Sequence, residues 1–243
     1  MGIPRKRGLL AAAVIVPVAL FAAVYLIFFT SDSPDRLTLS TADGEGAEVA
    51  GDAEVPVEGR WEVVAADSEA GYRVREKLAN LPAKSDAVGR TSAVTGGFVA
   101  EESDGGAVAG DVAFEVDLTG LKSDQDKRDN KIKEIGLETA KFPTAAFKST
   151  EPVEVPEEVL DGKAGTTEVT GDLTIHGTTK RVTIPLDVQR TVGDGGVPVV
   201  EVVGSLTFPF TDFGMSPPNV GVLVAVDPDA TLEFRLVMRK AGA

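Results

Sequence analysis

The chain has 243 residues, of which 43% are hydrophobic, and it carries a formal net charge of −14 at pH 7 without a single cysteine. An acidic chain is unsuited to nucleic acid, because binding to phosphates depends on Lys and Arg. The absence of cysteine excludes disulfides, thiolate catalysis, thiolate metal sites and a lipidated N-terminal cysteine.

An apolar stretch without any charge covers residues 9–29. As a helix it would be about 31 Å long, which matches the hydrocarbon core of a bilayer. Three basic residues at positions 5–7 precede it. Because basic flanks stay in the cytoplasm, we expect residues 1–8 on the cytoplasmic side and the rest of the chain on the other side. The stretch is too long for a signal peptide and lacks a small-residue cleavage site, so we predict an uncleaved, single-pass anchor in the cell membrane.

Residues 30–58 are rich in Asp, Glu, Gly, Ala, Ser and Pro and contain no aromatic side chain. Such a segment buries too little apolar surface to offset its chain entropy. We therefore predict an acidic flexible linker that spans roughly 30 Å r.m.s.. All 38 acidic residues and 21 of the 24 basic ones follow Thr30, so the exported part has a formal charge of −17. This charge argues against the domain lying flat on anionic lipid.

Residues 59–240 have an ordinary length for one domain, and their dominant hydrophobic period is two. Apolar and polar residues alternate over 112–118, 182–188 and 232–238, which is typical of antiparallel strands with one buried face. Further strands are predicted at residues 61–64, 91–100, 146–153, 168–175, 199–208 and 221–226. Joints rich in Gly and Asp at 104–106 and 193–196 predict hairpin turns.

Two segments are predicted to be short helices. Residues 68–81 offer Ser68 as an N-cap, Glu69 in the first turn and Pro82 beyond the end. Residues 131–140 form the second. The predicted fold is therefore mostly β, with about eight antiparallel strands and two short helices behind a single transmembrane helix. Periodicity alone is compatible with a closed barrel and with a sandwich.

Three motifs follow one another in this domain. Residues 123–129 (SDQDKRD) lead into 142–149 (FPTAAFKS), residues 169–180 read VTGDLTIHGTTK, and residues 212–215 read DFGM. In this order they resemble the YceI family of polyisoprenoid-binding proteins over residues 59–240. The resemblance implies a lipocalin-like antiparallel β-barrel whose long apolar interior takes a polyprenyl chain. The chain departs from the family before DFGM, where relatives commonly carry an Arg.

The implied barrel would bind its ligand with the apolar faces of its strands. An eight-stranded barrel is wide enough to be filled by side chains or to hold one small ligand, so the same residues are also explained by simple core packing. The predicted ligand-binding residues are Phe98, Phe114, Val116, Phe142, Phe147, Leu173, Ile175, Phe208, Phe213, Phe234 and Arg128.

The polar candidates leave two interpretations open. Arg128 either meets a phosphate or hydroxyl end group at the barrel mouth, or it fixes its loop against the barrel together with Asp129 through charge-assisted hydrogen bonds. His176, the only histidine, is best explained as a hydrogen-bonding turn residue. Asp124 and Asp126 begin like a calcium loop, but the positions that follow do not fit that pattern, so no metal site is predicted.

The predicted function is that of a membrane-tethered, extracytoplasmic protein that holds an isoprenoid lipid of polyprenyl or quinone type. The alternative is a protein–protein interaction module on a rigid barrel without a lipid. We expect no enzyme, because there is no cysteine and no serine motif for His176 to serve. Neither a cofactor besides the bound lipid nor a nucleic-acid partner is expected. Whether residues 211–218 form a lid stays open.

Overall fold

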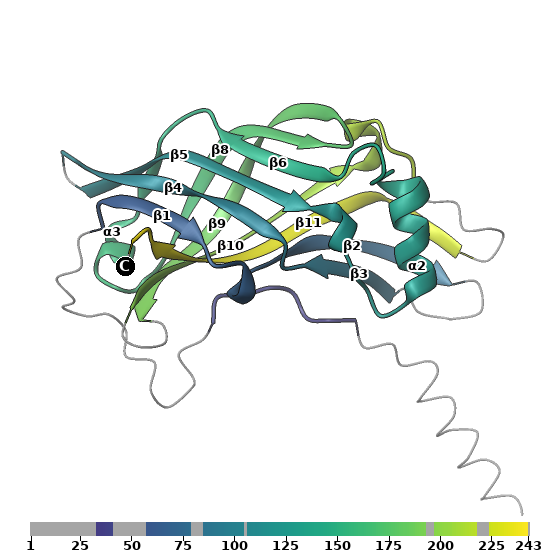
Figure 1. The fold of residues 1–243 in the computed structure, drawn as a ribbon, viewed down its shortest axis with the longest axis horizontal. Helices are drawn as coiled ribbons and strands as arrows, with labels where there is room; N and C mark the ends of the chain where they lie inside the picture. Colours follow the sequence, from purple (N-terminus) through teal and green to yellow (C-terminus); the bar gives the residue numbers. More distant parts are fainter. Residues whose placement is uncertain are drawn as a thin grey trace, which may run out of the picture.

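The computed structural model of the chain describes residues 33–40, 57–78, 85–104, 106–192, 197–217 and 224–242. Most of them belong to antiparallel strands that curve into a barrel (Figure 1). The strands are β1 (Gly59–Val63), β2 (Glu69–Leu78), β3 (Ser85–Thr91), β4 (Val94–Ser103), β5 (Gly106–Asp117), β6 (Thr144–Ser149), β7 (Val153–Val155), β8 (Ala164–Ile175), β9 (Thr178–Val192), β10 (Pro198–Pro209) and β11 (Val224–Lys240).

Eight of these strands form a closed ring in the order β1–β4–β5–β6–β8–β9–β10–β11. The ring closes where Trp61 of β1 pairs with Lys240 of β11. The other half of β11 pairs with β2, which in turn pairs with β3, and the short β7 pairs with β5. The predicted antiparallel, eight-stranded, mostly β fold is therefore confirmed, and the barrel alternative is the correct one. The eight strands of the closed ring have no open edge of the kind that a sandwich must protect, and an open edge remains at β3 outside the ring.

Two short α-helices accompany the barrel, α2 (Asp126–Lys131) and α3 (Glu157–Leu160). Figure 1 shows α2 at one end of the barrel and α3 at the other. Helix α2 continues as the π-helical turn η3 (Ile132–Gly136), so the helical segment predicted at 131–140 begins and ends earlier than expected. Single 3₁₀ turns occur at η1 (Ala65–Asp67), η2 (Leu118–Gly120) and η5 (Phe210–Phe213).

The helix predicted at residues 68–81 is wrong, because most of this segment is strand β2. Its backbone pairs with β11 on one side and β3 on the other, partners that a helix would leave unpaired. Ser68 does not cap a helix. Its hydroxyl donates to the carbonyl of Val64 (2.9 Å) and accepts from the N–H of Val237 (3.0 Å), so it joins the turn before β2 to β11.

The barrel interior divides into a packed half and a hollow half. The packed half surrounds Trp61, whose ring is stacked on Phe98 (6.2 Å) and whose Nε1 donates to the carbonyl of Val57 (2.8 Å). Aliphatic residues from most strands and Val159 of α3 complete this core. The hollow half lies toward α2, with a second cluster around Phe208 and Phe213 in its wall.

Several sequence predictions concern residues outside the described ones. The predicted transmembrane segment 9–29, most of the linker 30–58 and the hairpin joint 193–196 belong to this group. Among the described residues, no helix has the length and apolar character needed to cross a membrane. The pairing of Ser103 with Gly106 agrees with the hairpin predicted at 104–106. Within the predicted linker, residues 33–40 are described and lie against the outside of the barrel.

Candidate functional site

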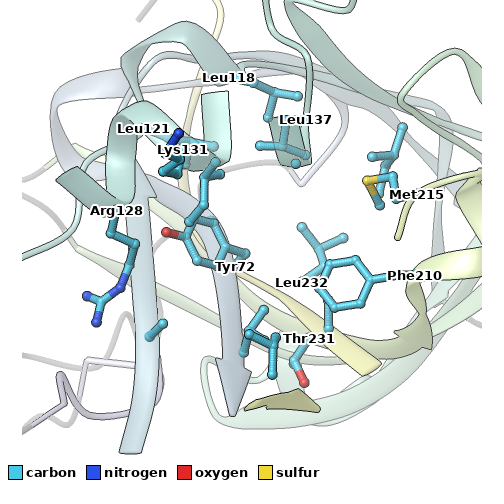
Figure 2. A pocket seen from close by; sticks show the side chains of 18 of the residues that line it. Tyr72, Leu118, Leu121, Arg128, Lys131, Leu137, Phe210, Met215, Thr231 and Leu232 are labelled. Atoms are coloured by element: carbon cyan, nitrogen blue, oxygen red, sulfur yellow. The ribbon is translucent and has the colours of Figure 1, made fainter. Parts of the chain in front are cut away.

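A cavity of about 610 Å³ occupies the hollow half of the barrel (Figure 2). Ligand pockets generally measure about 300–1,000 Å³. Its wall is built by the inward faces of several strands together with η2, η5 and the α2–η3 segment, and it is mostly apolar. The large apolar residues in the lining are Val74, Val116, Leu118, Leu121, Ile132, Leu137, Ile175, Phe208, Phe210, Met215, Val226 and Leu232.

The cavity opens beside α2. Four lining residues are exposed to solvent, and all of them belong to α2 or to the residue that precedes it: Gln125, Lys127, Asn130 and Lys131. The other described lining residues are buried or half-buried. We call this opening the mouth. It lies at the end of the barrel opposite the packed half.

A polar pole lies just inside the mouth. Arg128 donates to Glu76 (Nη2 to Oε1, 2.6 Å) and to Asp124, and both Arg128 and Glu76 line the cavity. Their side chains are only 16% and 11% exposed. Burial alone would lower the pKa of Arg128, but the carboxylates of Glu76 and Asp124 outweigh it and raise that pKa. The guanidinium is therefore charged, and its charge is already compensated by protein groups.

Tyr72 stands beside this pair and points its ring into the cavity (Figure 2). Burial raises the pKa of its phenol well above the usual value, against the opposing effect of Arg128. The hydroxyl is therefore a neutral donor, and the described residues provide no hydrogen-bond partner for it. Gly89, its cross-strand neighbour on β3, makes room for the ring, since a Cβ there would come within 2.3 Å of a ring carbon.

The loop before α2 is held by two neighbouring charged residues, Asp129 and Arg128. The buried carboxylate of Asp129 accepts from the backbone N–H of Ser123 (2.9 Å) and from its hydroxyl (2.6 Å). Arg128 bonds to Asp124 of the same loop and, through Glu76, joins α2 to β2 beside the cavity. The contacts of both residues agree with the interpretation that the pair fixes the loop against the barrel, and Arg128 contributes to the polar pole as well.

The predicted ligand-binding residues are distributed over several parts of the barrel. Those that line the cavity are Val116, Ile175, Phe208 and Arg128. Those that pack in or against the packed half are Phe98, Phe114 and Phe234. Those that pack behind the cavity wall are Phe147, Leu173 and Phe213. Phe213 is 1% exposed and meets Phe208 edge to face (4.8 Å), so it stabilises the wall from behind.

Phe142 does not line the cavity. It precedes β6, and its ring packs against the turn between β8 and β9. This turn consists of His176 and Gly177, both with positive φ (52° and 71°), as two-residue hairpins require. The Phe142 ring packs on His176 (4.5 Å), and a Cβ at Gly177 would meet that ring at 2.5 Å. His176 Nε2 is bonded to Glu138 (2.6 Å), which makes it the hydrogen-bonding turn residue expected from the sequence.

Sequence reasoning missed Tyr72, Val74 and Glu76, because it assigned their segment to a helix. The alternation of Ala70, Tyr72 and Val74 with polar or small residues was the signal that identifies the strand. It also missed the lining residues in turns and helices, since alternation along strands says nothing about them. These are Leu118, Leu121, Leu137, Phe210 and Met215.

Comparison with known proteins shows to which family this barrel belongs. The family model for the YceI-like domain matches residues 61–238.

The chain belongs to the YceI-like family.

Curated relatives and solved structures agree with this membership. A UPF0312 protein of Vibrio cholerae is 40% identical over 77 residues, which cover 31% of this chain and 37% of the relative. A UPF0312 protein of Vibrio vulnificus is 35% identical over 97 residues, or 40% of this chain and 47% of the relative. The chain therefore spans less than half the length of these curated relatives.

Two solved structures share the YceI-like fold. A polyisoprenoid binding domain from Saccharophagus degradans, implicated in plant cell wall breakdown, superposes with a TM-score of 0.56 at 17% identity and covers 74% of this chain and 98% of that domain. BcnA of Burkholderia cenocepacia superposes with a TM-score of 0.51 at 19% identity and covers 72% and 98%. At such identities the likeness concerns the fold.

Proposed function

We propose that this YceI-like protein is a membrane-tethered, extracytoplasmic binding protein that holds an isoprenoid lipid of polyprenyl or quinone type. The observation that carries the proposal is the apolar cavity of about 610 Å³ in the hollow half, with a single polar pole at its mouth. Burial of each CH₂ group stabilises a complex by about 0.8 kcal/mol, so such a lining favours a long hydrocarbon over a polar ligand.

The polar pole sets the direction in which a ligand enters. A prenyl chain fits among the aliphatic and aromatic residues of the wall, with its polar end near Tyr72 and Arg128 at the mouth. The neutral Tyr72 hydroxyl donates to a carbonyl or hydroxyl oxygen of the ligand. Because Glu76 and Asp124 already compensate Arg128, this pole suits an uncharged end group such as a quinone ring or an alcohol.

Binding rather than catalysis is supported by the position of the polar groups. His176 is bonded to Glu138 on the outer turn and does not line the cavity. The relative from Saccharophagus degradans, described as polyisoprenoid binding, shares the fold. The tether is proposed from the apolar residues 9–29 with their basic flank.

The test is native mass spectrometry of the purified protein before and after organic extraction. We expect an extractable prenyl lipid or quinone, or uptake of one when it is added. Ala145 faces the cavity and Ala146, its neighbour on β6, faces outward. We therefore expect Ala145→Phe to lower the lipid occupancy by filling the cavity, and Ala146→Phe to leave it unchanged.

Equal occupancy in the two variants would place the lipid elsewhere on the protein. A folded protein that takes up no prenyl lipid or quinone would contradict the proposal. In that case a stable partner recovered by crosslinking would support the alternative, an interaction module on a rigid barrel.

A further inference from the structure

Residues 33–40, which we call the strut, are bound to the outside of the barrel (purple in Figure 1). At its first residue, the Ser33 hydroxyl donates to the carbonyl of Asp86 (2.8 Å) and accepts from the N–H of Asp86 (3.1 Å). Asp86 belongs to β3, the last strand of the sheet order. One serine thereby satisfies both backbone groups of a residue at the open edge of the sheet.

Buried charges hold the middle of the strut. Arg73, 6% exposed, donates to the carbonyls of Pro34 (2.8 Å) and Asp35 (3.1 Å) and forms an ion pair with Glu233 (3.1 Å). Arg90 donates to the carbonyl of Asp35 (2.6 Å) and pairs with Glu233 as well (2.9 Å). The barrel also supplies Asp86 to Arg73 (3.2 Å) and Glu69 to Arg90 (3.6 Å). Buried charges are costly unless their hydrogen bonds are complete, and the strut carbonyls add acceptors to this cluster.

The last residue of the strut is bound to a second buried carboxylate. The backbone N–H of Ser40 donates to both oxygens of Glu201 (3.1 Å each), and its hydroxyl donates to one of them (2.9 Å). Arg235 donates to the Ser40 hydroxyl (2.8 Å). The strut is therefore fixed at its start, middle and end, in contrast to the flexible linker expected for this part of the chain.

The strut begins at the mouth end of the barrel. Asp86, which holds Ser33, follows Ser85 in β3, and Ser85 pairs with Glu76. Glu76 is the partner of Arg128 at the polar pole. From there the strut leads away along β11 toward the packed half. The chain that precedes Ser33 consequently meets the barrel at the end that carries the mouth.

The predicted membrane span is close to this point in the sequence. It ends at Phe29, four residues before Ser33. Four residues extend to about 14 Å at most. The 12-residue strand β8 is about 40 Å long at 3.3 Å per residue. A span that ends within 14 Å of Ser33 keeps the mouth end of the barrel near the bilayer and the packed end away from it.

The surface at this end is much less acidic than the rest of the exported chain. Residues 122–141, which we call the cap, include α2 and η3 and contain six basic and five acidic residues, a formal charge of +1. The rest of the chain after Thr30 carries −18. Ile135 of the cap is the exposed large hydrophobic residue among those described, at 62% exposure. The cap therefore lacks the negative charge that keeps the rest of the domain away from anionic lipid, and it offers an apolar side chain to the lipid headgroup layer.

We infer that the cap is a bilayer-contact surface and that the strut holds the mouth against the membrane that carries the anchor. A lipid then passes between the bilayer and the cavity without crossing water. The inference rests on the tether in the proposed function, and it adds the orientation of the barrel and the partner of the cap, a phospholipid headgroup layer.

The absence of native cysteine permits a direct test with the full chain in vesicles of phosphatidylcholine and phosphatidylglycerol. A fluorophore is attached to Ile135→Cys in the cap or, as the control, to the exposed Glu158→Cys in α3, and lipids with a quencher in the acyl chain are included. We expect quenching at position 135 and none at 158. Ten Gly and Ser residues inserted between Thr30 and Ser31 lengthen the connection, and we expect this insertion to reduce the quenching at 135.

The outcomes separate orientation from lipid binding, because the same samples are extracted and analysed for bound prenyl lipid. Absent quenching at 135 in protein that carries lipid would overturn the inference and leave the binding function intact. Quenching at 135 in protein without lipid would support the orientation and contradict the function. Equal quenching at 135 and 158, or a full chain that does not float with the vesicles, would overturn the inference.

Discussion

Tyr72 combines a buried ring with a hydroxyl that faces the cavity. Because of this burial, the free energy of unfolding of the barrel should fall as the pH becomes alkaline. The pKa of Tyr72 is raised in the folded state, so the folded protein holds the phenol proton more tightly than the unfolded chain does. The resulting stabilisation is present below pH 10, the ordinary pKa of tyrosine, and is lost as the pH rises above about 10. We expect Tyr72→Phe to lose less stability than the original protein between pH 9 and 11, as measured by urea unfolding. Parallel pH curves for the two proteins would contradict the prediction.

The Arg128–Glu76 pair at the polar pole is shielded enough from solvent to contribute to stability. Removing one partner leaves the other with an uncompensated charge in a half-buried site. We expect Arg128→Met to lower the free energy of unfolding by about 1–3 kcal/mol and the double variant with Glu76→Gln to lower it by less than the sum of the single changes. A double-mutant cycle measures this coupling. Additive effects would show that the pair contributes no coupling.

At the level of elements, the strut provides the clearest energetic test. Ser40→Ala removes the hydroxyl between Glu201 and Arg235 and should lower the free energy of unfolding by about 0.5–1.5 kcal/mol. Thr38 is exposed on the same strut, so Thr38→Ala is the matched control, with an expected change within about 0.5 kcal/mol. Thermal unfolding of both variants measures the two changes in stability. Equal effects would mean that the hydroxyl bonds of Ser40 do not contribute to holding the strut.

The strands predicted correctly from the sequence are those in which apolar and polar residues alternate, because this alternation shows which side chains face the interior. Residues 112–118, 182–188 and 232–238 alternate, and they lie in β5, β9 and β11 except for Leu118, which begins η2. The failure at β2 has a physical cause: Ser68 and Glu69 form a local start signal for a helix, while the pairing of β2 with β11 involves residues about 160 positions away in the chain. Local signals cannot report such distant partners. The same limit applies to the strut, whose composition predicts a flexible chain and whose anchoring charges lie in β2, β3, β10 and β11.

For the molecule as a whole, the division into two halves separates the single tryptophan from the cavity. Trp61 lies in the packed half. We expect a bound lipid to raise the melting temperature, because it stabilises only the folded state. The emission maximum of Trp61 should stay constant during the same titration, since no contact of its ring changes. A large shift of that emission would mean that the ligand reaches the packed half.

This division also explains why the site was only partly predictable. Phe98 and Phe208 both lie on inward faces of strands and show the same alternation, yet one fills the packed half and the other lines the cavity. Strand periodicity fixes the direction of a side chain but not the space in front of it. That space depends on which large residues meet from opposite walls of the ring, and the sequence does not display those encounters.

The packed half has one more consequence for the proposed ligand, which concerns the length of prenyl chain that the cavity can enclose. Trp61, Phe98 and the aliphatic residues around them close the interior at a fixed depth, so a chain entering at the mouth cannot thread through to the other end. Each added isoprene unit gains burial only until that floor is reached, and further units remain outside at the mouth. Affinity measured along a series of prenyl lengths should therefore rise and then level off, at the chain length that fills the cavity down to the packed core.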